Sequence, residues 1–251
     1  AHAGTYVLHI TNAFGTATSA GATLALITRA PGSFEEMIVT NRPVAYWRLS
    51  EGPEYGSPEL ARDYVGGHDA YHTNVVAYPG LRPPSHLGME SDNLAGMYSG
   101  ATATAATESL MNNRAQFTLM GWFNPFSWPQ TTPGGSARVA LFGQNDAAEF
   151  GFHGANTVGI WTPNGGYVSF DATTLITPGN WYFITATGNG TNITFYLNGN
   201  QAATGGTATT NYGSSGSPFR IGYGVLDTEA NEFQGYIDEV VFFDRALSMA
   251  E

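Results

Sequence analysis

The stretch GYIDEVVFFDRALS, residues 235–248, places two carboxylates, Asp238 and Glu239, directly in front of the apolar run 240–243. An uninterrupted run of β-branched and aromatic residues predicts a buried strand. Carboxylates are among the groups least tolerated in such a strand unless a partner neutralises them. The pair therefore indicates a catalytic site, a metal site or a surface edge of a sheet, and the rest of the chain has to distinguish these.

The amino-acid composition excludes several classes of binding partner. It has 251 residues, a formal net charge of −11, nine basic residues that are all arginine, and no cysteine. A basic groove for nucleic acid is therefore not expected, and an anionic membrane surface would repel the chain. Disulfides and thiol chemistry are excluded, and the absence of an apolar run of 18 residues predicts no membrane insertion. These features fit an extracellular or cell-surface protein.

Short apolar segments separated by Gly and Asn turns recur along the chain and favour an all-β sandwich. The clearest hairpin is residues 180–199, where Trp181, Phe183 and Thr185 alternate with the opposite face and the turn GNGTN reverses the chain. The segment 33–40, SFEEMIVT, predicts one or two helical turns.

The first residues form a separate pattern. Tyr6, Leu8 and Ile10 alternate along one predicted strand, the turn NAFG follows, and a second strand returns. The tyrosine in a GxY context and the N-x-x-G turn resemble the last two strands of an immunoglobulin-like domain. We therefore expect residues 1–29 to be the C-terminal strands of an Ig-like domain. Because two strands are marginal alone, preceding chain, the next domain or a neighbouring molecule should complete them.

Residues 30–43 predict a linker, and residues 44–251 predict a second domain. Five motifs carry a resemblance of this second domain to the bacterial laminin G-like domains of the concanavalin A-like lectin/glucanase superfamily. They are AYWRLSE at 45–51, FTLMGWFNP at 117–125, NWYFITATGNGTNITFYLNG at 180–199, FRIGYG at 219–224 and FQGYIDEVVFFDRALS at 233–248. The resemblance implies a jelly-roll sandwich of two antiparallel sheets in which the first and last strands are neighbours.

The same resemblance implies a Ca²⁺ at one rim of the sandwich, held by Asp238, Asp63 and Glu51, with Asp69 as a weaker addition. Ca²⁺ prefers several oxygens from carboxylates and loop carbonyls, which the segment RDYVGGHD offers. The alternative is that Asp238 caps a turn and that Asp63 is solvated. His68 and His72 could form a transition-metal pair, but we expect them to be solvated loop histidines.

Catalysis is not predicted. A glycosidase needs two carboxyls roughly 5 to 9.5 Å apart. Adjacent residues on a strand point to opposite faces, which separates Asp238 from Glu239. Asp238 and Asp244 share a face but lie about 20 Å apart at the usual rise per residue. The sequence therefore predicts that the protein is not an enzyme.

Binding is the remaining function. Trp128 lies in a Pro/Gly loop, and Trp161 and Tyr167 lie in GIWTPNGGYVSF, so these three rings are the candidates for holding a sugar. Trp47, Trp122 and Trp181 are expected in the core. The sequence thus predicts a non-catalytic binding or adhesion module in a large multidomain protein. Its partners would be a glycan or protein ligand on a cell or matrix surface and the neighbouring domains. The alternative is a structural bead of a tandem or filament protein without a small ligand.

Overall fold

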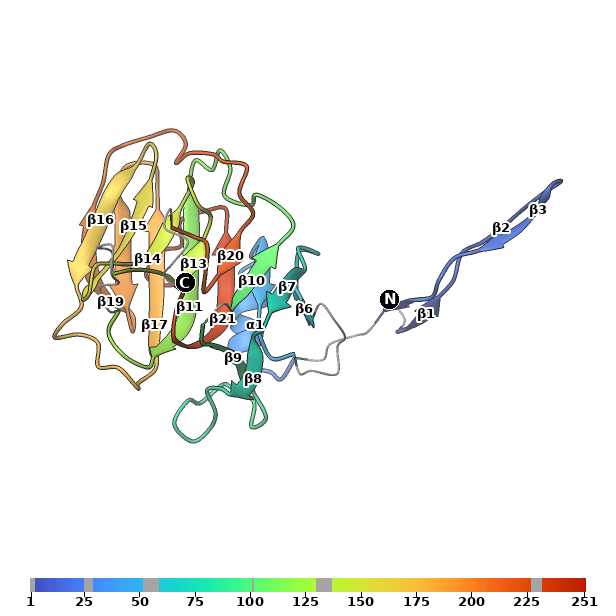
Figure 1. Ribbon diagram of the computed structural model, residues 1–251, viewed down its shortest axis with the longest axis horizontal. Coiled ribbons are helices and arrows are strands. Elements are labelled where there is room, and N and C mark those ends of the chain that lie inside the picture. Colours follow the sequence, from blue (N-terminus) through green and yellow to red (C-terminus); the bar gives the residue numbers. More distant parts are fainter. Residues whose placement is uncertain (1–2, 25–28, 52–58, 101, 130–136, 227–231) are drawn as a thin grey trace.

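The computed structural model describes residues 3–24, 29–51, 59–100, 102–129, 137–226 and 232–251. Almost all regular structure in these residues is antiparallel β, and two sheet layers enclose the core (Figure 1). This confirms the prediction of an all-β sandwich. No helix in the described part of the chain has the length and apolar character needed to span a membrane.

The first layer is one eight-stranded sheet, whose central strand carries the Asp238–Glu239 pair. Its strands in spatial order are β19 (Asn200–Gly205), β18 (Ile193–Leu197), β17 (Tyr182–Gly188), β11 (Phe117–Pro125), β21 (Gly235–Phe243), β9 (Leu94–Tyr98) and β8 (Val76–Pro79), with β5 (Ala45–Trp47) also pairing with β21. The pairing of β5 with β21 confirms that the first and last strands of the sandwich are neighbours.

The second layer consists of a five-stranded and a four-stranded sheet. The five strands in order are β13 (Phe142–Gly143), β20 (Arg220–Ile221), β10 (Ala103–Ala106), β7 (Ala70–Thr73) and β6 (Glu59–Ala61), and the four are β12 (Arg138–Ala140), β14 (Glu149–His153), β15 (Thr157–Thr162) and β16 (Gly166–Asp171). Inward residues of both layers form one contiguous cluster that includes Trp47, Phe150 and Phe242. Trp47 is fully buried and stacks on Phe219, as expected for a core residue.

A β-bulge interrupts the alternation of β21 at its two acids. Met120 on β11 pairs with Val241, but Trp122 pairs with Asp238, so the single residue between them faces two residues of β21. Glu239 adopts a left-handed φ of 55°, which is uncommon for a residue with a side chain. The extra residue shifts the register, and Val240 still enters the core between the two layers.

The helix α1 (Phe34–Thr40) lies in the predicted linker and packs on the outer face of the eight-stranded sheet. Ser33 caps it by accepting a hydrogen bond from the Glu36 N–H, and the Glu36 carboxylate accepts one from the Gly32 N–H. Ile38 is buried in a cluster with residues of β5, β11 and β21. The apolar face of this short helix is therefore covered by the sheet.

The N-terminal segment forms a long hairpin outside the two layers (Figure 1). Its strands are β1 (Gly4–Tyr6), β2 (His9–Asn12), β3 (Gly15–Thr18) and β4 (Ala22–Leu24), which pair as β1 with β4 and β2 with β3. The side chains of Tyr6, Leu8 and Ile10 are exposed. The second domain therefore does not complete this hairpin, contrary to one of the expected arrangements, and its completion by other chain stays a prediction.

Candidate functional site

The bulge brings both acids of β21 into one buried polar network. Glu239 accepts hydrogen bonds from the Tyr46 hydroxyl and from Nε of Arg48, the latter at 3.1 Å. Asp238 accepts one from Nδ2 of Asn93 at 2.8 Å, and Arg48 also donates to the Asn93 side chain. The prediction that the two carboxylates point to opposite faces was therefore wrong. It assumed regular alternation, which a residue with left-handed φ at position 239 breaks.

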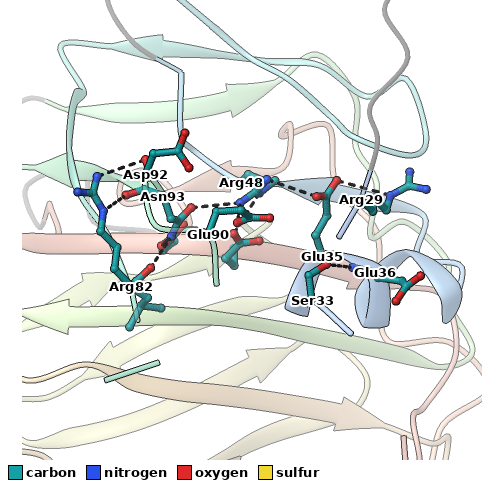
Figure 2. A network of polar contacts seen from close by, with 12 residues as sticks. Arg29, Ser33, Glu35, Glu36, Arg48, Arg82, Glu90, Asp92 and Asn93 are labelled. Atoms are coloured by element: carbon teal, nitrogen blue, oxygen red, sulfur yellow. Dashed lines mark hydrogen bonds and ion pairs between the residues drawn. The ribbon is translucent and has the colours of Figure 1, made fainter. Parts of the chain in front are cut away.

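Arg48 is the centre of this network (Figure 2). Its guanidinium lies 2.5 Å from the Glu90 carboxylate and 3.5 Å from that of Glu35, in addition to its contact with Glu239. Glu35 also pairs with Arg29 at 3.5 Å. These residues belong to α1, to the segment after β5, to the loop between β8 and β9, and to β21. The network therefore fixes the helix and that loop on the outer face of the sheet.

Burial raises the pKa values of Asp238 and Glu239. Desolvation raises the pKa of Asp238 well above its ordinary value, and the neighbouring Glu239 charge raises it further. Desolvation also raises the pKa of Glu239, while Arg48 and the Tyr46 hydroxyl oppose the rise. Burial therefore favours the protonated form of both acids, and it raises the pKa of Glu239 to about 7. Both side chains are inaccessible to solvent, so they cannot reach a substrate, and the arrangement serves as a structural clamp.

The predicted metal ligands have other partners. The Asp63 carboxylate accepts hydrogen bonds from backbone N–H groups of its own loop and of β5, namely those of Tyr46, Val65, Gly66 and His68. Asp69, the weaker candidate, accepts one from the Asp63 N–H. Asp63 is thus neither solvated nor free, and it holds the turn after β6 against β5.

Glu51, the third predicted metal ligand, has partners different from those of Asp238 and Asp63. It is buried, accepts a hydrogen bond from the Arg62 N–H, and lies 4.0 Å from Nε2 of His72. Its pKa is raised by desolvation. Among the described residues, no three His, Asp or Glu side chains are placed to hold a metal ion. The structure therefore does not bring Asp238, Asp63 and Glu51 together as a ligand set, and calcium stays a prediction.

The expectation of two solvated loop histidines was wrong for His72. This residue lies on β7, where Nδ1 is 2.7 Å from the Thr104 hydroxyl, and burial lowers its pKa to about 4. His68 is partly buried, and its Nδ1 lies 3.6 Å from the Glu108 carboxylate. The two rings have different partners, which argues against a shared metal.

Two of the three predicted sugar-binding rings meet on one surface. Trp161 on β15 and Tyr167 on β16 are cross-strand partners. Their neighbours Ile160 and Val168 enter the core, so alternation turns both rings to the outer face of the four-stranded sheet. Trp161 is partly exposed and Tyr167 is 47% exposed.

The adjacent strand completes this surface, which we call the β14–β16 face (outward side chains of Glu149, His153, Trp161 and Tyr167). The His153 ring lies 5.0 Å from that of Tyr167, and its Nε2–H donates to the Glu149 carbonyl at 3.0 Å. Burial lowers the pKa of His153 to about 4, so the ring is neutral at pH 7. The Glu149 carboxylate is buried against Arg138 at 2.7 Å. The face thus combines exposed ring surface with polar groups in fixed positions.

Trp128 does not join this face. Its ring meets Phe152 edge-on with centroids 6.4 Å apart, and Phe152 points into the core. His153, the next residue, points outward to Tyr167. Trp128 is therefore on the inner side of β14, partly buried against the core and apart from Trp161 and Tyr167, and a role of Trp128 in ligand binding stays a prediction.

Trp122 and Trp181 were expected in the core but are partly exposed on the outer face of the eight-stranded sheet. They line a cavity of about 360 Å³ together with His86, Phe183 and Asn198. The sequence carried a signal for this, because Trp122 shares its parity on β11 with Thr118 and Asn124, not with the core residues Leu119 and Phe123.

Comparison with known proteins agrees with this architecture. A family model described as the concanavalin A-like lectin/glucanases superfamily matches residues 97–251. None of the curated protein sequences matches the chain.

Solved structures give the same fold at low sequence identity. The binding domain of botulinum neurotoxin DC in complex with SialylT superposes with a TM-score of 0.57 and 15% identity over 84% of this chain. This chain spans 49% of that one. Domain 4 of AbnA, a GH43 extracellular arabinanase from Geobacillus stearothermophilus, in complex with arabinotriose, gives a TM-score of 0.53 and 15% identity over 83% of this chain and 95% of that one. The binding domain of botulinum neurotoxin DC with rat synaptotagmin II gives a TM-score of 0.57 and 15% identity over 84% and 50% of the two chains.

Proposed function

We propose, from the premise that this chain belongs to the concanavalin A-like lectin/glucanase superfamily, that it is a non-catalytic glycan-binding module of an extracellular or cell-surface protein. The observation that carries the proposal is the β14–β16 face. Trp161 and Tyr167 present ring surface there on the side of their strands that faces away from the core. Apolar C–H faces of a sugar ring pack against such rings, and hydroxyls pair with polar groups beside them.

The electrostatics of this face favour a neutral ligand. Arg138 is paired with Glu149 at 2.7 Å, and the His153 imidazole is uncharged at pH 7 because burial lowers its pKa. The chain as a whole is strongly acidic, with a net charge of −11. A neutral oligosaccharide avoids the repulsion that a polyanion would meet.

Two structures of similar fold were solved with carbohydrate ligands. One of the structures described above was solved with SialylT and another with arabinotriose. At 15% identity these likenesses show the fold alone, and the argument for glycan binding rests on the rings of this chain.

A glycan array on the full chain tests the proposal. We expect wild-type protein to bind at least one class of neutral oligosaccharide, and Trp161→Ala to weaken binding to that class by tenfold or more. Phe14→Ala is the matched control, because Phe14 is a 98% exposed ring on the distant hairpin and its loss should leave binding unchanged. Retention of full binding by both Trp161→Ala and Tyr167→Ala would contradict the assignment of this face.

The structural alternative, a bead in a tandem or filament assembly, is favoured by one observation. The hairpin exposes Leu8 and Ile10, at 62% and 56%, together with unpaired strand edges. Exposed apolar strands pair readily with other chains. If this is their role, wild-type protein should self-associate in sedimentation experiments and Ile10→Asp should be monomeric. Monomeric wild-type protein at all concentrations would argue against it.

A further inference from the structure

The outer face of the eight-stranded sheet carries a second aromatic surface that the proposed site does not use. The rings of Trp122 and Phe183 lie 5.1 Å apart on neighbouring strands, and the His86 ring meets Trp122 edge-on at 5.4 Å. Trp181 lies just before β17 and stacks on Tyr236 of β21, with centroids 6.0 Å apart and planes at 27°. These rings come from three strands and from the loop between β8 and β9.

The rings line a shallow, open hollow on this face. This cavity of about 360 Å³ is lined by the rings of Trp122, Trp181 and Phe183 together with His86 and Asn198. Its volume falls in the range of about 300–1,000 Å³ that is usual for small-molecule sites. We call it the β11–β17 cavity (His86, Trp122, Trp181, Phe183 and Asn198).

These rings lie outside the core between the two layers. The core of the sandwich lies on the opposite side of β11, where Leu119 and Phe123 are fully buried. Trp122 and Trp181 remain partly exposed, although Phe34 of α1 meets the Trp122 ring edge-on with centroids 6.4 Å apart. Aromatic surface that gathers around one hollow on the solvent side of a sheet is a candidate binding site.

Two polar side chains at the rim of the β11–β17 cavity, Asn198 and His86, are placed to hydrogen-bond a ligand. The turn between β18 and β19 presents the exposed side chain of Asn198, whose Oδ1 accepts a hydrogen bond from the Phe183 N–H. Its Nδ2 donates to no group in the described chain and is free to donate to a ligand. The His86 imidazole offers a second polar edge, and burial lowers its pKa, so the ring is neutral at pH 7.

We infer that the β11–β17 cavity is a second glycan-binding site, in which a sugar ring stacks on Trp122 and Trp181 and its hydroxyls pair with Asn198 and His86. This inference takes its ligand class from the proposed function of the β14–β16 face. The two sites lie on opposite outer faces of the sandwich, because one is on the eight-stranded sheet and the other on the four-stranded sheet, with the core between them.

Two sites on opposite faces give the domain a property that one site lacks. A single domain binds two glycan chains at once and bridges them, because neither ligand blocks the other. On a surface that displays many glycans, the two binding events reinforce each other through the high local concentration of the second ligand. The domain therefore cross-links the glycans it binds.

Fluorine NMR of the full chain labelled with 5-fluorotryptophan tests this inference directly. The chain has five tryptophans, so five signals report separately after assignment by Trp→Phe variants. Trp161 reports the β14–β16 face, Trp122 and Trp181 report the cavity, and the buried Trp47 is an internal control. The probes are arabinotriose, xylohexaose, cellohexaose and maltohexaose, with a decaproline peptide as the competing ligand class.

We expect the signals of Trp122 and Trp181 to shift saturably with at least one oligosaccharide. Asn198→Asp keeps the oxygen that accepts from the Phe183 N–H and removes the free donor, so it should weaken this response by roughly three- to tenfold, the effect of one hydrogen bond. Tyr167→Ala should leave the response at the cavity unchanged.

The remaining outcomes separate the two sites. Shifts at Trp161 alone would overturn the second site and leave the proposed function standing. Shifts at Trp122 and Trp181 alone would support the cavity and overturn the β14–β16 face. A response of the cavity to decaproline only, or to none of the probes, would overturn the second glycan site.

Discussion

Replacing Arg48 by methionine tests whether the network under α1 is a structural clamp. The change keeps most of the aliphatic stem and removes the charge. It removes the countercharge shared by Glu239 and Glu35, whose side chains are only 1% and 4% exposed. Glu35 keeps Arg29 at 3.5 Å, whereas Glu239 has no other cation within ion-pair distance in the described chain. Removing one partner of a buried ion pair costs about 3–5 kcal/mol, because the remaining charge is desolvated and uncompensated. The contact with Glu90 adds little, since that side chain is 30% exposed.

This cost corresponds to a large shift in melting temperature. For a chain of this size, 1 kcal/mol lowers the Tm by about 2–4 °C, so Arg48→Met should lower it by roughly 6–20 °C. The assay is urea unfolding followed by tryptophan fluorescence, in which the midpoint falls while the dependence on urea stays constant. Asp244→Asn is the control, because that acid is 54% exposed and lies 3.6 Å from Arg114, and it should change stability little.

The stability lost in Arg48→Met should also depend on pH, in a direction that the pKa shifts define. Without Arg48, the pKa values of Glu239 and Glu35, already raised by burial, rise further. When the pKa of a buried acid is higher in the folded protein than in the unfolded chain, its contribution to stability is fully present at pH values below the unfolded-state pKa. This stability is lost as the pH rises through the folded pKa. The destabilisation by Arg48→Met should therefore be smaller at pH 5 than at pH 8, and the double variant with Glu239→Gln should recover part of the loss at pH 8.

A loss below about 1 kcal/mol, or one that shrinks as the pH rises, would refute the reasoning. The first result would mean that the network is screened by solvent. The second would mean that the acids do not carry the uncompensated charge.

Three further predictions can be checked with the same protein. If a cation binds near Asp238, Asp63 or Glu51, millimolar Ca²⁺ should raise the melting temperature and EDTA should lower it. The prediction would be wrong if neither reagent changes the melting temperature and mass spectrometry detects no bound metal. Purified protein should release no reducing sugar from the glycans it binds, because Asp238 and Glu239 are sealed from solvent; release that a single Asp or Glu substitution abolishes would contradict this. Ser33→Ala should cost about 0.5–2 kcal/mol in the urea assay through loss of the α1 cap, while Ser33→Asp, which keeps an acceptor at that position, should retain most of the stability.

The sequence was sufficient for the architecture because strand signals are local. Alternation in 180–199 predicted the hairpin of β17 and β18, and the family motifs predicted the pairing of β5 with β21. The short helix was also predictable, since Ser33 and Glu36 have the spacing of a capping box. Trp161 and Tyr167 were identified from the sequence as aromatic residues in one segment, and the structure makes them cross-strand partners.

The tertiary structure alone determined the contacts of Asp238 and Glu239 and the surroundings of most of the other aromatic rings. Asp238 and Glu239 share one network because a bulge adds a residue to β21, and no local sequence signal marks that irregularity. Their neutralising partner, Arg48, lies about two hundred residues earlier in the chain and comes near only when β5 pairs with β21. The parity of Trp122 with Thr118 and Asn124 indicated its face of β11, but the cavity forms only where His86, Trp181 and Asn198 from other segments meet it. Alternation along a strand specifies two faces, but only the opposing layer determines which of them is buried.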